Sequence, residues 1–396
     1  WARAKMMGGW LWSLGYSQSF HPALIQSASF GGAYAVSGLM IFVNTALYLA
    51  VKTQDAGHRT QDARHEGRRR RFLALGAGGF LLNAGFGLAL IGTSPPDKGE
   101  AWRVAAAQPN ISREDKTDVK LYNKNVARHL VLTKKAVMES RPDIVLWPET
   151  AFVDDILRDP VWRPRLEQVA RNFRTYLLVG SALLSDGKDI NSALLLSPEG
   201  VWAEAYYKRH LVPFSEYRPK DRISGKLYAG LGLRGYDFLA GKRVGIFTAG
   251  RGLEGRENVV RFGVAICSED GYPALFRELS RRGAGFMVVI LNDSWFSAPE
   301  ALMLHAEQSV FRAVESGRPV IRAANTGWTI AFNRHGQPLR TGAPSLQTSG
   351  LGVFDVHSVR GKTFYAQFGD FFVFVCAGFV IIILFMTIFR RRALND

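Results

Sequence analysis

Three residues of this 396-residue chain have side chains that could form a nucleophilic catalytic site: Glu149, Lys208 and Cys267. Cys267 ends the apolar run 259–266 and precedes the polar sequence Ser-Glu-Asp-Gly, so we expect a thiol at the tip of a buried strand. A thiol with a pKa of about 8.5 needs a base to take its proton and a cation to stabilise the charge that develops. A carboxylate and an ammonium at two other strand ends would supply both.

Each of these residues also has a simpler interpretation. A single cysteine is more often a small buried hydrophobic residue, and a glutamate or lysine after a strand is usually a solvated surface charge. The second cysteine, Cys376, lies inside an apolar run, so no disulfide is expected. No spacing of Cys and His that is typical of a metal site is present, and we expect neither a metal nor a cofactor.

The region 102–368 has the mixture of polar and apolar residues that is typical of a soluble domain, and its pattern predicts strands that alternate with helices. Apolar and β-branched runs predict strands, and amphipathic periodicity predicts helices, one of them with Pro164 at its favoured first position. The expected strands are 103–107, 144–147, 176–180, 192–196, 203–207, 259–266, 286–291, 320–324, 328–333 and 352–356, and the expected helices are 115–140, 164–173, 275–282 and 301–316. Alternation followed by hairpins predicts a mixed α/β sandwich.

Three uncharged apolar segments flank this domain. The segments 33–51, 72–92 and 371–389 each have roughly the 20 residues needed to cross the hydrocarbon layer of a membrane. Residues 1–30 are rich in aromatic side chains and predict an interfacial segment. The expected division is therefore a membrane region at 1–101 that ends in a linker, a catalytic domain at 102–368, and a transmembrane helix with a basic tail at 369–396.

The net charge of +16 suggests a nucleic-acid partner, but the placement of the basic residues argues against one. Seven Lys and Arg residues lie between 52 and 71, and three more follow the last apolar segment at 390–392. Basic loops beside membrane spans stay on the cytoplasmic side. We therefore expect the loop 52–71 and the C-terminal tail inside, the domain on the outer face of the membrane, and a lipid bilayer as partner.

The order of the motifs resembles the nitrilase superfamily and, within it, the membrane apolipoprotein N-acyltransferases. The residues that carry the resemblance are Trp147-Pro-Glu149, Tyr206-x-Lys208-x-His210-Leu-Val-Pro-Phe214-x-Glu216, Ile266-Cys-x-Glu269, the segments 292–296, 312–318 and 321–327, and 14–18 with Asn44. The resemblance covers nearly the whole chain and implies an αββα sandwich of the nitrilase type flanked by transmembrane helices. That family has more N-terminal spans and this chain begins at Trp1, so we expect its natural start to be missing.

The resemblance also implies a role for each matched residue. Glu149 is the expected general base, Cys267 the nucleophile and Lys208 the cation that stabilises the tetrahedral oxyanion. The supporting residues are Glu216 and Glu269, expected to orient Lys208 and shape the pocket, Trp295, expected near the substrate entrance, and Ser268, whose backbone amide could donate to an oxyanion. The family usually has a tyrosine where this chain has Ser268, which puts full activity in question.

The implied activity is transfer of an acyl chain from a glycerophospholipid, through a thioester on Cys267, to the N-terminal amine of a diacylglyceryl-cysteine apolipoprotein. The expected location is the inner membrane of a bacterium, with several membrane passes, and the expected working unit is a monomer. Loop 227–238 could touch the membrane or be an ordinary surface turn. The alternatives are a membrane-tethered nitrilase-like amidase that uses the same three residues with water, and an inactive lipid-binding protein.

Overall fold

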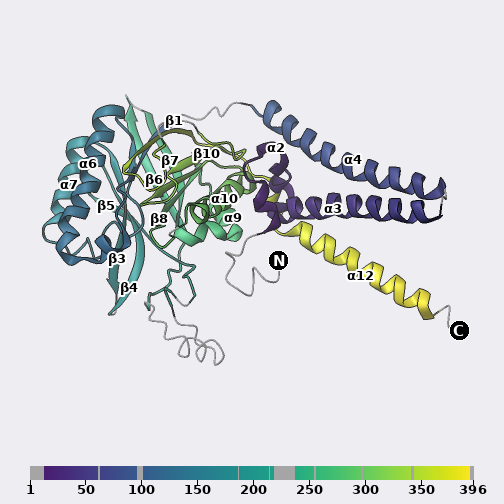
Figure 1. The fold of residues 1–396 in the computed structure, drawn as a ribbon. Helices are drawn as coiled ribbons and strands as arrows, with labels where there is room; N and C mark the ends of the chain where they lie inside the picture. Colours follow the sequence, from purple (N-terminus) through teal and green to yellow (C-terminus); the bar gives the residue numbers. More distant parts are fainter. Residues whose placement is uncertain are drawn as a thin grey trace, which may run out of the picture.

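The computed structural model shows a two-sheet domain from which three long helices project in one direction (Figure 1). The structure describes residues 13–60, 63–95, 101–185, 187–213, 215–217, 237–253, 256–296, 298–339 and 343–392. Two expectations fall partly or wholly elsewhere. Residues 1–12 of the expected interfacial segment, and loop 227–238 apart from its last residues, lie outside the described part of the chain.

The helices and strands follow one another in an order close to the predicted one. In chain order they are η1 (Leu14–Gln18), α2 (Pro22–Ile25), α3 (Ala28–Thr60), α4 (Ala63–Thr93), β1 (Ala101–Gln108), α5 (Arg113–Thr117), η2 (Val119–Leu121), α6 (Tyr122–Ser140), β2 (Ile144–Leu146), α7 (Trp162–Phe173), β3 (Tyr176–Ser185), β4 (Lys188–Leu196), β5 (Trp202–Tyr207), β6 (Gly245–Leu253), β7 (Arg256–Ile266), η3 (Cys267–Gly271), α9 (Pro273–Arg281), β8 (Phe286–Leu291), α10 (Pro299–Ser316), β9 (Val320–Ala324), β10 (Ile330–Phe332), β11 (Gly350–His357), α11 (Phe364–Phe368) and α12 (Phe371–Arg392).

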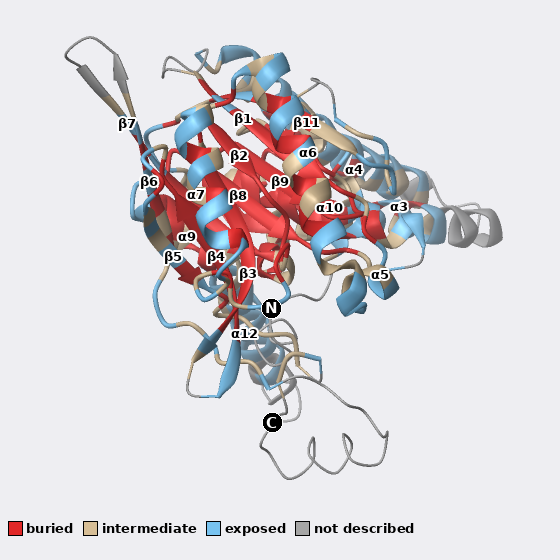
Figure 2. Ribbon diagram, turned by 90° about the vertical axis from the view of Figure 1, so that its left-hand side faces the viewer, coloured by how far each residue is buried: buried red, intermediate tan, exposed pale blue. Residues whose placement is uncertain are grey.

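Two sheets pack face to face at the centre of the domain. The six-stranded sheet has the order β11-β1-β2-β3-β4-β5, and the five-stranded sheet the order β10-β9-β8-β7-β6. The strands β1, β2 and β3 are parallel, as are β7, β8 and β9, and the outer strands pair antiparallel. Apolar side chains fill the space between the sheets; the rings of Phe262 and Phe286, for example, stack at 5.3 Å. Figure 2 shows the strands buried and the exposed residues mostly on the helices outside them.

Helices cover the outer face of each sheet. The apolar sides of α6 and α7 pack on the six-stranded sheet, and those of α9 and α10 pack on the five-stranded sheet (Figure 1). Parallel strands need cover on both faces, which explains why the predicted strands are continuous apolar runs rather than alternating ones. The expected αββα sandwich is confirmed.

Three sequence expectations about this domain were wrong in detail. The single helix expected at 115–140 is divided, because the side chain of Asp118 accepts from the amide of Lys120 at 2.9 Å and starts a new turn. The helix α7 begins at Trp162, so Pro164 occupies its third position and not its first. A backbone nitrogen in the first turn has no helical hydrogen-bond acceptor, so the missing N–H of proline removes no helical hydrogen bond at either position. Strand β6 was not predicted because its glycines lower the β propensity of the run.

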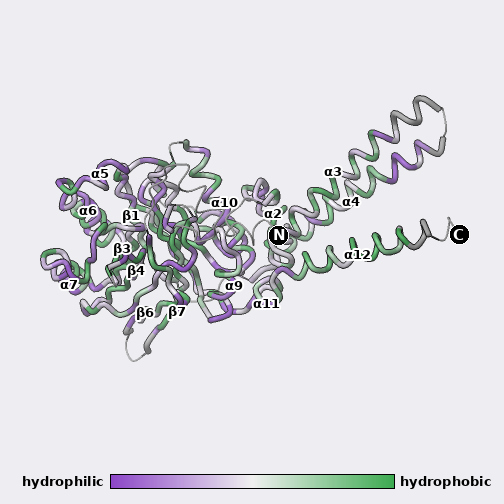
Figure 3. Tube along the Cα trace, turned by 90° about the horizontal axis from the view of Figure 1, so that it is seen from below, coloured by the Kyte–Doolittle hydropathy of each residue, from purple (hydrophilic) through white to green (hydrophobic). Residues whose placement is uncertain are grey.

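Within the part of the chain that the structure describes, three helices are long and apolar enough to cross a membrane: Ala28–Thr53, His65–Thr93 and Phe371–Ile388. Figure 3 shows the hydrophobic residues along α3, α4 and α12. The expected basic loop 52–71 is wrong as a loop, because α3 continues to Thr60 and α4 begins at Ala63. Lys, Arg, Gln and Ala have high helix propensity, so the basic residues lengthen both helices beyond their apolar parts.

The domain end of α3 is anchored to the domain at a break in the helix. Gly32 has a φ of +67°, and a Cβ placed there would lie 2.5 Å from the ring of Tyr365. The departure from helical geometry leaves the amide of Ala33 free to donate to the buried carboxylate of Glu315 on α10, at 2.9 Å. Only glycine combines this conformation with this close approach.

The same carboxylate connects the membrane segment to the turn after Cys267. Glu315 pairs with Arg312 at 2.8 Å. The guanidinium of Arg312 also donates to the hydroxyl of Tyr16 at 3.1 Å and to the carbonyl of Asp270 at 3.3 Å. Residues before the first long helix, on α10 and in η3 are therefore joined by one buried arginine.

Candidate active site

Four strands deliver polar residues to one edge of the sandwich. Glu149 follows β2 and Lys208 directly follows β5, both from the six-stranded sheet. Cys267 directly follows β7 and Asn292 follows β8, both from the five-stranded sheet. The site therefore lies across the two sheets, on strand ends that the common core holds rigidly.

Lys208 is only 1% exposed and its ammonium lies between two carboxylates. Its Nζ is 2.8 Å from Oε1 of Glu216 and 3.5 Å from Oε1 of Glu149. The side-chain amide of Asn191 donates to both carboxylates, at 3.3 and 2.7 Å. Burial alone would lower the pKa of Lys208, but the charges of Glu216 and Glu149 raise it above its ordinary value. The lysine is therefore a permanent cation at neutral pH.

Cys267 begins η3 with a φ of +53°, a left-handed conformation that few residues other than glycine adopt. Such conformations persist where the surrounding structure enforces them, and they cluster at active sites. Burial raises the pKa of the thiol well above its ordinary value; Glu149 raises it further and Lys208 lowers it. The thiol is therefore protonated at neutral pH, and it lies within range of the charges of both predicted partners.

The carboxylate of Glu149 is held at both oxygens. Oε1 accepts from Asn191 at 2.7 Å, and Oε2 accepts from the backbone amide of Asn292 at 2.9 Å. The segment after β2 can approach β3 closely because Gly180 has no side chain; a Cβ there would lie 2.3 Å from the carbonyl oxygen of Pro148. The carboxylate thus has one orientation before any substrate arrives.

Glu269 lies close enough for the charge of Lys208 to lower its pKa, but its hydrogen bonds run to the residues around the lysine. It accepts from the hydroxyl of Tyr206 at 2.8 Å and from the amides of Arg209 and His210 at 2.8 and 3.0 Å. Burial raises its pKa, but the nearby His210 side chain, whose Nδ1 lies 3.5 Å from Oε1, and the hydrogen bonds from backbone amides lower the pKa overall. Glu269 therefore fixes the backbone that follows Lys208, holds the side chain of Tyr206 before it, and ties both to the turn that carries the cysteine, where it also accepts from the amide of Ile266 at 2.9 Å.

Of the two remaining predicted residues, Ser268 lies in η3, next to Cys267, and Trp295 lies at the surface. The buried hydroxyl of Ser268 has no hydrogen-bond partner among the described residues. Trp295 is 53% exposed, and the guanidinium of Arg113 lies 4.2 Å from its ring centroid. Arg113 belongs to α5, whose Lys116 donates to the carbonyl of Glu149 at 2.9 Å, so the exposed indole is linked to the site through one short helix.

A buried group of charges beneath η3 was not predicted. Asp270 pairs with Arg322 and with Nε2 of His305, the latter at 3.1 Å, while Nδ1 of His305 lies 2.8 Å from Asp293. Burial opposes a charge on His305, but the two aspartates raise its pKa to about 10. An imidazolium between two carboxylates therefore supports the turn that presents Cys267.

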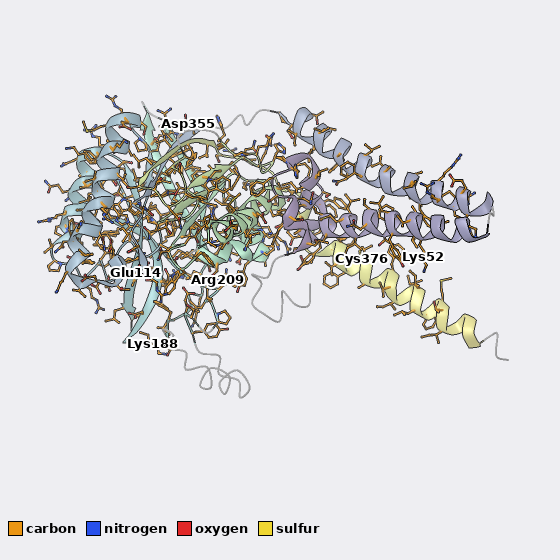
Figure 4. The ribbon with its side chains drawn as sticks, in the orientation of Figure 1. Lys52, Glu114, Lys188, Arg209, Asp355 and Cys376 are labelled. Carbon is orange, nitrogen blue, oxygen red and sulfur yellow. The ribbon has the colours of Figure 1, made fainter. Side chains whose placement is uncertain are left out.

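Three polar residues at the site were missed because their sequence context shows no chemistry. Asn191 lies inside a strand, Lys116 falls in the segment predicted as one amphipathic helix, and His305 falls in another. An amide or imidazole within an otherwise apolar stretch was the available signal. Figure 4 shows the second cysteine, Cys376, on α12 and away from the sheets; both cysteines are free.

Comparison with known proteins identifies the families whose sequences this chain matches. The carbon-nitrogen hydrolase family matches residues 103–359, and the N-terminal domain of apolipoprotein N-acyltransferases matches residues 1–46. Among solved structures, Nit3 of Saccharomyces cerevisiae, a member of branch 10 of the nitrilase superfamily, aligns at 16% identity with a TM-score of 0.47. That alignment covers 65% of this chain and 90% of Nit3.

Two relatives carry the same name. The chain is 32% identical over 401 residues to the apolipoprotein N-acyltransferase of Geobacter metallireducens, which covers 99% of this chain and 73% of the relative. It is 28% identical over 295 residues to that of Thermotoga maritima, covering 74% of this chain and 53% of the relative. The chain thus spans between about half and three quarters of these relatives' lengths. It belongs to the apolipoprotein N-acyltransferase family of the carbon-nitrogen hydrolases.

Proposed function

We propose that this protein transfers an acyl chain from a glycerophospholipid to the N-terminal amine of a diacylglyceryl-modified apolipoprotein, through a thioester on Cys267. The observation that carries the proposal is the buried cation of Lys208, which lies between Glu149 and Glu216 and acts electrostatically on Cys267. Membership of the family supports acyl transfer, and the three apolar helices support a substrate that resides in a membrane.

In the first half-reaction Glu149 takes the proton of the Cys267 thiol, and the sulfur attacks the ester carbonyl carbon of the phospholipid. Lys208 stabilises the negative oxygen of the tetrahedral intermediate, as a preorganised charge in a dry site does most effectively. The ester C–O bond breaks, and the lysophospholipid leaves with the proton returned by Glu149. The acyl chain is then held as a thioester, and the site is free for a second lipid.

In the second half-reaction the amine of the apolipoprotein cysteine attacks the thioester carbonyl. Glu149 accepts a proton from this amine, the C–S bond breaks, and the amide product leaves while the sulfur regains its proton. Splitting the transfer into two displacements allows two bulky lipids to use one pocket in turn. The orientation of Glu149 by Asn191 and Asn292 suits a base that serves both steps.

The proposed location is the cytoplasmic membrane of a bacterium, with the domain on its outer face. Basic residues extend α3 and α4 beyond their apolar parts, and Arg390 to Arg392 end α12, at the ends of these helices that point away from the domain (Figure 1). Basic segments stay on the cytoplasmic side, so the domain lies opposite them. The proposed working unit is a monomer.

The test is intact mass spectrometry of the purified protein after incubation with phospholipid vesicles. We expect an adduct with the mass of one acyl chain, labile to hydroxylamine, in the wild type and in Cys376→Ala, but absent in Cys267→Ala. The exposed Cys376 controls for chemical acylation of a lipid-facing thiol. An adduct that survives Cys267→Ala would refute the proposal, and ammonia release from small amides without any adduct would favour an amidase.

A further inference from the structure

Lys116 is a cation that the reaction above does not use. It lies half-buried on α5, and its Nζ donates to the carbonyl oxygen of Glu149 at 2.9 Å. The next residue, Thr150, has a φ of +46°, which is a genuine outlier for a β-branched side chain. The hydrogen bond from Lys116 therefore acts on the peptide group that joins the expected base to a strained residue.

The ammonium of Lys116 also borders a cavity of about 10 Å³, the room that one water molecule occupies. Two buried acceptors line the same cavity and lack a hydrogen-bond partner among the described residues: Oδ1 of Asn125 and Nε2 of His129. Nδ1 of His129 lies 2.8 Å from the carbonyl of Asn125. A carbonyl only accepts, so Nδ1 carries the hydrogen and Nε2 presents its lone pair to the cavity.

The cavity therefore offers one water molecule a donor and two acceptors, the usual three hydrogen bonds of an internal water. We propose that Lys116 is a positioning residue: by its hydrogen bond to the Glu149 carbonyl, and with one water molecule in this cavity shared with Asn125 and His129, it holds the backbone of Glu149 in the conformation from which that carboxylate serves Cys267. This inference rests on the roles proposed above for Glu149 and Cys267.

The charge states of the two basic groups agree with this arrangement. Burial lowers the pKa of His129 to about 3, so its ring is neutral and can accept through Nε2. Burial also lowers the pKa of Lys116, to about 8, and the charge of Glu149 acts against that lowering. Lys116 is therefore largely cationic at neutral pH, and its ammonium can donate to the Glu149 carbonyl and to the water together.

The test measures how fast iodoacetamide alkylates Cys267 at pH 7.5, in the full chain carrying Cys376→Ala so that one thiol remains. We expect Lys116→Met to slow alkylation about tenfold and Lys116→Gln, which keeps an N–H donor, to stay within about threefold of the parent. His129→Phe keeps a ring against Trp147 but removes the cavity acceptor, and should slow alkylation about threefold. The matched control is Lys120→Met, an exposed lysine on the following turn, which should change nothing.

Chemical rescue separates positioning from general destabilisation. In Lys116→Ala, ethylammonium at millimolar concentration should restore part of the rate, whereas tetramethylammonium, which has no N–H donor, should not. The inference is overturned if Lys116→Met reacts as fast as Lys120→Met, if the Gln variant is as slow as the Met variant, or if both cations rescue equally. Alkylation needs no lipid, so this result is independent of whether the acyl adduct of the proposed function forms.

Discussion

The replacement Lys208→Met tests whether the buried cation is required by the two carboxylates beside it. Removing one partner of a buried ion pair leaves an uncompensated charge and destabilises a protein by about 3–5 kcal/mol. Here Glu149 and Glu216 would share the Asn191 amide with no cation between them. About 1 kcal/mol changes the melting temperature of a domain of this size by about 2–4 °C, so we expect a fall of about 6–20 °C.

The loss should also depend on pH. Without Lys208, one of the two carboxylates is expected to stay protonated in the folded protein, so its folded pKa rises above the unfolded value of about 4.3. A raised folded pKa makes the variant most stable at low pH and less stable as the pH rises through the folded pKa. The difference from wild type should therefore be smaller at pH 5 than at pH 8, and Lys208→Met/Glu216→Gln should recover part of it.

The assay is thermal unfolding in detergent at both pH values, with Lys188→Met as the matched control. Lys188 begins β4 at the outer edge of the domain (Figure 4), is paired with Asp237 at 2.6 Å, and has a side chain 44% exposed. An exposed pair contributes about 1 kcal/mol or less, so this control should melt within about 4 °C of wild type. Equal losses in the two variants, or a Lys208→Met loss that does not change with pH, would refute the electrostatic reasoning.

Three further predictions concern the supports of the site. His305 has a folded pKa of about 10 against an ordinary 6.5, so the stability that its charge contributes is complete below about pH 6.5 and is lost as the pH rises towards 10. The melting temperature of the wild type should therefore fall over this pH range, and that of His305→Gln should change less. Asp270→Asn removes a buried partner of that imidazolium and should lower the melting temperature by about 6–20 °C, while leaving secondary structure by circular dichroism intact. Gly32→Ala places a methyl group against Tyr365 at a positive φ and should lower the melting temperature, whereas Gly78→Ala, with open space around it, should not.

The layers of the domain could be predicted because its strands are short apolar runs between helices of clear periodicity. The strand before Cys267 and the helix after it were both placed from composition alone. The pairing order of the two sheets is not contained in such runs, since β11 pairs with β1 across most of the domain sequence. The extension of α3 and α4 into the basic segment was missed because a charge cluster was interpreted as a loop, although Lys and Arg extend helices readily.

Motifs identified the residues that meet at the site, but not what holds them there. Glu149 and Lys208 stand out because each follows a strand within a distinctive motif. Asn191 donates to Glu149 and to Glu216, the two carboxylates beside Lys208, yet it lies within a strand whose other residues are mostly apolar. A hydrogen bond between residues far apart in the chain leaves no local pattern, which is why the sequence did not indicate that Glu269 bonds the amides next to Lys208.

The membrane segment contributes to the domain as well as anchoring it. Arg312 is completely buried; its guanidinium donates to Tyr16 before the first long helix and to the carbonyl of Asp270 beside the nucleophile turn, and it forms an ion pair with Glu315. One oxygen of Glu315 in turn accepts from the amide that the break in α3 sets free. Residues outside the sandwich therefore contribute a hydrogen bond to each end of the buried Arg–Glu pair on α10, which is the kind of support a buried ion pair needs. The position of the first membrane helix and the conformation of the turn that carries Cys267 are thus constrained by the same pair of charges.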